Sequence, residues 1–195
     1  MKRLTEKGLA LATVSAAALL GAAVCEQVQI HGRYVFECYD KDGKLKWTDT
    51  IENTVVTVGK NLILDQSLAG SSYTAAEYLG LISSASYSAI SAADTMSSHS
   101  GWLEAGSSNA PTFSGNRASC SWSSASGGSK ALSSNPSFSI TGTGTLKGAF
   151  LAGGASVSST IGNTSGTLIS AGLFTGGDRS VLSGDTVNVS YSMSI

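Results

Sequence analysis

The residues from Thr186 to Ile195 alternate strictly between polar and apolar side chains, and this pattern constrains the fold more than any other in the chain. Successive side chains of a β-strand point to opposite faces, so such alternation is typical of an antiparallel strand with one buried and one solvated face. The buried face is expected to carry Val187, Val189, Tyr191, Met193 and Ile195.

Residues 33–50 predict a β-hairpin of the same kind. Tyr34, Phe36 and Cys38 fall on one face of its first strand, and Asp42-Gly43 supplies the positive φ that a tight turn needs. A β-branched run covers 54–58. A short helix is expected at 60–68, and further short strands at 77–83, 118–123, 137–141, 145–151 and 167–174.

This series of short strands separated by turn residues predicts a mainly β, antiparallel sandwich or jelly roll. The predicted β domain covers residues 31–195. Gly is abundant at 23 residues, and 42% of the chain is hydrophobic, which is not the composition of a disordered protein.

Residues 8–24 are apolar and follow Lys2, Arg3 and Lys7, a pattern that resembles a bacterial signal peptide. As a helix the run would span on the order of 30 Å, but its alanine content makes it a weak membrane span, and no stable membrane association is expected. We favour a retained helical arm over residues 1–30 that docks on protein, either the surface of a partner or another copy of the chain. A cleaved signal stays the alternative.

The composition restricts the partners. Charged residues make up 13% of the chain, the net charge is −1, and no stripe of Lys and Arg appears, so nucleic acid is not an expected partner. The three cysteines, Cys25, Cys38 and Cys120, fit no metal spacing and are expected to be reduced thiols, as in a protein assembled in the cytosol.

No motif for catalysis or for a metal or cofactor emerges. Asp94 and His99 lie near many serines, but no Gly-x-Ser-x-Gly motif accompanies them. We expect both to hydrogen-bond within an irregular loop at 91–104, with Trp102 either packing this loop or serving as an exposed anchor for a partner. Residues 40–43 resemble the start of a calcium loop, but Ile51 stands where the closing acidic residue belongs.

Residues 176–179 form a Gly-Gly-Asp-Arg turn rather than a phosphate loop, since no helix with Lys-Ser/Thr follows. Asp178 and Arg179 are expected to form a local ion pair in this turn. The chain is therefore expected not to be an enzyme.

Five stretches in order, FECYDKDGKLKW, NTVVTVGKNLILD, YLGLI, AADTMSSHSGWLE and GTLISAGLFTGGDRSVLSGDTVNVSYSMSI, resemble small structural proteins of tailed bacteriophages over residues 33–195. The first thirty residues depart from that pattern. The resemblance implies a non-enzymatic virion protein, a decoration (cement) protein that stabilises the capsid.

The partners implied are the major capsid protein and other copies of the chain, as a dimer or trimer, on the capsid surface after assembly in the host cytoplasm. Two alternatives remain: a tail or head-fibre component involved in host attachment, and an exported bacterial surface β-protein whose residues 1–24 are a cleaved signal. The residues expected at an interface are Leu9, Leu11, Leu19, Leu20, Trp47, His99 and Trp102.

Overall fold

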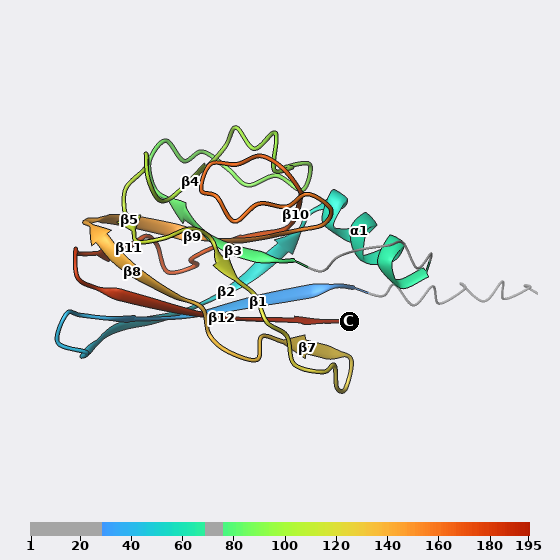
Figure 1. The fold of residues 1–195 in the computed structure, drawn as a ribbon, viewed down its shortest axis with the longest axis horizontal. Coiled ribbons are helices and arrows are strands. Elements are labelled where there is room, and N and C mark those ends of the chain that lie inside the picture. The colour runs from blue at the N-terminus through green and yellow to red at the C-terminus, as the bar shows by residue number, and fades with distance from the viewer. Residues whose placement is uncertain (1–28, 69–75) are drawn as a thin grey trace, which may run out of the picture.

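The structure, a computed structural model, describes residues 29–68 and 76–195, which form an antiparallel β fold with one short helix (Figure 1). The longer elements are β1 (His31–Tyr39), β2 (Leu45–Val55), α1 (Thr57–Leu68), β3 (Tyr78–Ser83), β8 (Ser137–Gly142), β9 (Gly144–Gly153), β10 (Thr167–Leu173) and β12 (Thr186–Ser194). The shorter strands are β4 (Leu103–Glu104), β5 (Thr112–Phe113), β6 (Ala118–Ser119), β7 (Ser129–Ala131) and β11 (Arg179–Val181).

All these strands belong to one sheet, with the order β4-β3-β9-β10-β2-β1-β12-β8-β5, while β11 pairs with β9, β6 with β3 and β7 with β12. The sheet curls strongly, like half of a barrel, so that β3, β9 and β10 lie above β1 and β12, and β8 rises between the two levels (Figure 1). The predicted mainly antiparallel β fold is confirmed. Its finer form, a sandwich or jelly roll, stays a prediction.

The predicted hairpin is β1 followed by β2, and each strand extends beyond the expected range. Tyr34 pairs with Ile51 in its register. Gly43 has a φ of 77°, and Asp40 Oδ1 accepts hydrogen bonds from the backbone N–H groups of Asp42 and Lys44 at 3.0 and 2.8 Å. The Asp-Gly turn thus sets the hairpin, as its chemistry predicts.

An inner core lies between the two halves of the curled sheet. β1 and β12 line it from one side, and β3 and β9 from the other. The alternation in both predicted strands is confirmed for six inward side chains that are at most 1% exposed: Tyr34, Phe36, Cys38, Val187, Val189 and Tyr191. Met193 is only half-buried, and the expected burial of Ile195 is wrong, because this residue follows the end of β12 and is 73% exposed.

A second core, the outer cluster, covers the opposite face of β3, β9 and β10. Ile82 and Phe150 point to this face, whereas their strand neighbours Leu81 and Leu151 point inward. Met96 and other side chains of the connecting loops pack on it. This half of the sheet is therefore buried on both faces.

Helix α1 begins at Thr57, three residues before the expected start, because the β-branched run at 54–58 is divided between two elements. The Val56 N–H donates to the Ile169 carbonyl, and the Lys60 N–H donates to the Val56 carbonyl. The helix rests closely on β10: a Cβ at Gly59 would lie 2.2 Å from the Ile169 carbonyl oxygen.

The predicted arm over residues 1–30, with Leu9, Leu11, Leu19 and Leu20, lies outside the described residues except for its last two positions. Among the residues that the structure describes, no helix combines the length and apolar character needed to cross a membrane.

Candidate functional site

Residues 84–109 and 154–166, here named the loop layer, cover the outer face of β3, β9 and β10 (Figure 1). The first segment follows β3 and contains β4, and the second connects β9 to β10. Tyr87, Ile90 and Val157 pack against the outer cluster from this layer. Serine, alanine and glycine make up most of the rest of its sequence, so a layer this poor in large side chains needs polar interactions to fix its shape.

A buried ion pair joins the loop layer to the start of β6. Arg117 Nε lies 2.8 Å from Glu104 Oε1, and Arg117 Nη2 lies 2.8 Å from Oε2, a two-pronged geometry. The Arg117 side chain is 1% exposed and that of Glu104 is 7% exposed. Because both charges are removed from water, loss of either side chain would leave the other charge buried without a counter-ion.

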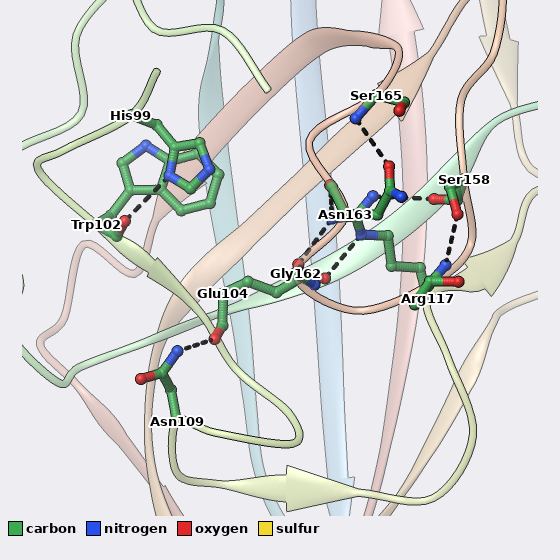
Figure 2. Close-up of polar contacts among 10 residues, drawn as sticks. His99, Trp102, Glu104, Asn109, Arg117, Ser158, Gly162, Asn163 and Ser165 are labelled. Atoms are coloured by element: carbon green, nitrogen blue, oxygen red, sulfur yellow. Dashed lines mark hydrogen bonds and ion pairs between the residues drawn. The ribbon is translucent and has the colours of Figure 1, made fainter. Parts of the chain in front are cut away.

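The same pair holds the second segment of the loop layer (Figure 2). Glu104 Oε2 also accepts a hydrogen bond from the Gly162 N–H at 2.7 Å. Arg117 donates from Nη1 to the Ser158 carbonyl at 2.9 Å and from Nη2 to the Asn163 carbonyl at 2.7 Å. Its guanidinium also lies 5.4 Å from the centre of the Phe150 ring. One ion pair therefore fixes two loops on the sheet.

The loop at 91–104 is fixed by a second polar group. Trp102 Nε1 donates to Asp94 Oδ2 at 2.9 Å, and the Ser91 N–H donates to the same oxygen at 3.0 Å. The His99 ring stacks on the Trp102 ring at 3.9 Å between centres, and its Nδ1 lies 3.1 Å from the Trp102 carbonyl oxygen (Figure 2). The prediction that Asp94 and His99 bond within the loop is confirmed.

Trp102 is 0% exposed, and its ring lies 5.2 Å from that of Phe150. Of the two interpretations of Trp102, packing of the loop is confirmed and the exposed anchor is wrong, because the indole completes the outer cluster instead of facing a partner. His99 stays half-buried above it.

Trp47, the third aromatic residue expected at an interface, lies elsewhere. It is half-buried on β2, contacts the inner core, meets the Phe174 ring edge to face at 5.8 Å, and donates from Nε1 to the Ser180 carbonyl. The three aromatic residues are thus divided between the inner core and the outer cluster, and the structure does not bring them into one site.

A cavity of about 240 Å³ opens in the loop layer beside the ion pair and is lined by His99, Glu104, Asn109, Arg117, Ile161 and other residues. Both carboxylate oxygens of Glu104 already accept bonds within the chain, so this group is held as a structural anchor. The described residues contain no group of three or more His, Cys, Asp or Glu side chains placed to hold a metal ion.

The expected local ion pair between Asp178 and Arg179 is wrong. Lys147 Nζ lies 2.7 Å from Asp178 Oδ1, and Arg179 Nε donates to Asp49 Oδ2 at 2.7 Å. Consecutive side chains at the start of a strand point in different directions. Asp178 and Arg179 therefore each pair with a residue on another strand.

Cys38 and Cys120 are free, in line with the expectation for these two cysteines. Burial, with the Asp185 carboxylate nearby, raises the pKa of the Cys38 thiol to about 12. Burial likewise raises the pKa of Cys120 to about 12. The thiolate is the reactive form of cysteine, so both side chains are poor nucleophiles at neutral pH.

Sequence reasoning missed the pairing of Glu104 with Arg117, the buried charges that join the loop layer to the start of β6. The two residues are thirteen positions apart, and Gly162 is a further 45 residues along the chain from Arg117. No local motif marks such a contact. A comparison with protein-family models, with curated proteins and with solved structures finds no match to this chain.

Proposed function

We propose that the chain is a non-enzymatic virion protein of a tailed bacteriophage that binds and stabilises the capsid as a decoration protein. The proposal takes its identity from the resemblance of residues 33–195 to small phage structural proteins. Its expected partners are the major capsid protein and further copies of this chain, as a dimer or trimer, on the capsid surface. A tail or head-fibre component and an exported bacterial surface β-protein are the alternatives.

The observation that supports a binding role is the set of buried polar contacts that hold the loop layer on the sheet. Its exposed side chains are small, for example those of Ser97, Ser107 and Ser108, and the buried pair of Arg117 with Glu104 fixes the backbone beneath them. A surface that is already ordered loses little conformational freedom when it binds. Many symmetric copies on a shell would add up individually modest contacts.

Two finer parts of the fold prediction belong to this proposal. The inner core lies between two facing halves of the sheet, which supports a sandwich-like or jelly-roll arrangement. The arm over residues 1–30 is proposed to bury its apolar side chains against protein.

The first test is the number of copies per purified phage particle, measured by quantitative mass spectrometry against the major capsid protein. A decoration protein is expected in hundreds of copies, whereas tens or fewer would indicate a tail or fibre component. The intact mass of the native protein tests the alternative of an exported surface β-protein, because a chain that begins near Cys25 would indicate export.

The second test addresses the surface. Ser97→Arg with Ser107→Arg adds two large cations to the loop layer, and co-sedimentation with capsids is expected to fall at least tenfold. The matched control is Ser133→Arg with Ser134→Arg, which adds the same charge at exposed positions between β7 and β8. Equal binding by both variants would contradict a role for the loop layer in attachment.

A further inference from the structure

An apolar groove of about 590 Å³ opens at the end of the curled sheet where α1 and the last residues of β12 lie. Figure 1 shows the C-terminal end and α1 on the same side of the molecule. The apolar side chains that line the groove come from the helix, from β9, β10 and β12, and from the segment before β7: Ile63, Trp122, Leu151, Ile169, Met193 and Ile195.

The groove continues the inner core beyond the point where the described chain covers it. On the inward face of β12, Val189 is 0% exposed and Tyr191 is 1% exposed, whereas Met193 is half-buried and Ile195 is 73% exposed. Polar and apolar side chains still alternate here, but the apolar side chains become more exposed from Tyr191 to Ile195. Apolar side chains that follow a core strand without a cover indicate a missing packing partner.

The start of the described chain lies at the same place. His31 pairs with Ser194, the residue before Ile195, so β1 begins beside the wall of the groove. Residues 25–30 separate this point from the apolar run at 8–24, which contains no charged residue. Six residues can span roughly 20 Å, so the run can reach the groove of its own chain.

We propose that the groove is the docking site of residues 8–24 of the same chain, with Leu19 and Leu20 contributing side chains to it. The occupant is apolar like the lining, and it is tethered at the rim, which gives it a high local concentration there. The inference concerns the isolated protein and does not rest on the proposed function. It assigns the arm to its own fold rather than to a shell or to a second copy.

Methionine methyl NMR of the full chain tests the proposal, because its three methionines include one in the groove and one in the outer cluster. Met193 lines the groove, and Met96 is 1% exposed beneath the loop layer. In the variant carrying both Leu19→Asp and Leu20→Asp, the Met193 methyl signal is expected to shift by more than its linewidth. The Met96 signal reports that the fold is intact and is expected to stay unchanged.

Leu4→Asp is the matched control, since it adds a charge outside the apolar run, and both methyl signals are expected to keep their positions. A Met193 signal that is the same in the parent chain and in the double variant would overturn the proposal. So would a Met193 signal that moves on tenfold dilution, which would assign the groove to a second copy. A native protein whose mass begins near Cys25 would overturn it as well.

Proteolysis tests the same proposal with substitutions in the groove instead of in residues 8–24. Elastase cleaves after small apolar residues, and docking is expected to protect residues 8–24 from it. Ile63→Asp, in the groove, is expected to speed cleavage at least fivefold, whereas Leu64→Asp, at a helix position that is 52% exposed and outside the lining, is expected to leave the rate unchanged. Equal rates for these two variants would contradict docking in the groove.

Discussion

Glu104 and Arg117 face each other with both carboxylate oxygens 2.8 Å from guanidinium nitrogens, and the same carboxylate accepts the Gly162 N–H at 2.7 Å. Three segments that are distant in the sequence therefore meet at one charged contact. The contact lies on the outer face of a sheet whose inner face is already filled.

Arg117→Met leaves the Glu104 carboxylate buried without its cation, and we expect it to lower the free energy of unfolding by about 3–5 kcal/mol. Chemical denaturation measures the change. Arg33→Met is the control, because the Arg33–Glu52 pair is more than half exposed on both sides and is expected to contribute less than about 1 kcal/mol. In the double variant Arg117→Met with Glu104→Leu, part of the stability should return. If the double variant is less stable than Arg117→Met, the unpaired charge is not the cause.

Trp102→Phe removes the hydrogen bond to Asp94 and part of a fully buried ring. The expected loss is about 2 kcal/mol, because a hydrogen bond to a charged acceptor contributes more than one to a neutral acceptor. The loss of this packing should also increase the rate of proteolytic cleavage within residues 84–101. Trp47→Phe removes a half-buried indole that bonds only a carbonyl, and it should cost less and leave the loop protected. An equal loss of stability in the two variants would contradict the role of the buried Trp102–Asp94 hydrogen bond in holding the loop.

Stability should fall as the pH rises above about 9. Burial raises the pKa of Cys38, Cys120 and Tyr191 to about 12 each, from ordinary values of 9.0 for the thiols and 10.0 for the phenol. Between those values the unfolded chain has released protons that the folded chain retains, so the unfolded state binds fewer protons and the free energy of unfolding decreases with pH. Below about pH 8 the contribution is complete, and it is lost as the pH approaches 12.

The midpoint of urea unfolding at pH 8, 9, 10 and 11 measures this slope. Cys120→Ala and Tyr191→Phe remove one titrating group each and should flatten it. An alkaline slope that persists unchanged in both variants would show that other groups set the pH dependence.

Gly59→Ala should destabilise the protein although alanine favours a helix over glycine by about 1 kcal/mol. The added Cβ would lie 2.2 Å from the Ile169 carbonyl oxygen, so α1 has to move away from β10. Lys60→Ala, at the exposed neighbouring position, controls for propensity and should be neutral or slightly stabilising. A rise in the unfolding midpoint of Gly59→Ala would mean that the helix does not rest on β10 at this distance.

The sequence predicts the strands best where alternation and turn chemistry agree. The Asp-Gly turn and the apolar positions of β1 and β12 follow from local rules, and the structure confirms them. The start of α1 does not follow from such rules. The β-branched run at 54–58 favours a strand, but backbone hydrogen bonds from Val56 to Ile169 and from Thr57 to Ala92 end β2 at Val55. Contacts between distant segments decide that boundary.

The site depends on such contacts even more. Arg117 is an isolated charge in the sequence. It comes close to Glu104 because β4 and β6 both pair with β3, and its side chain also reaches the loop at 158–163. Arg179 likewise pairs with Asp49 rather than with its neighbour Asp178. The paired charges come from different strands and loops, and no spacing rule specifies which of them meet.

The nine-residue pairing of β1 with β12 has a consequence for biosynthesis. Each residue from His31 to Tyr39 pairs with a residue between Thr186 and Ser194. β1 therefore cannot complete this pairing until β12 has been synthesised. During translation the β1–β2 hairpin is complete long before β12 emerges from the ribosome, and the free edge of β1 stays without this partner until then. A product truncated before Thr186 would keep an unpaired strand edge beside an incomplete core, and it would be a substrate for chaperones and proteases rather than a smaller version of the protein.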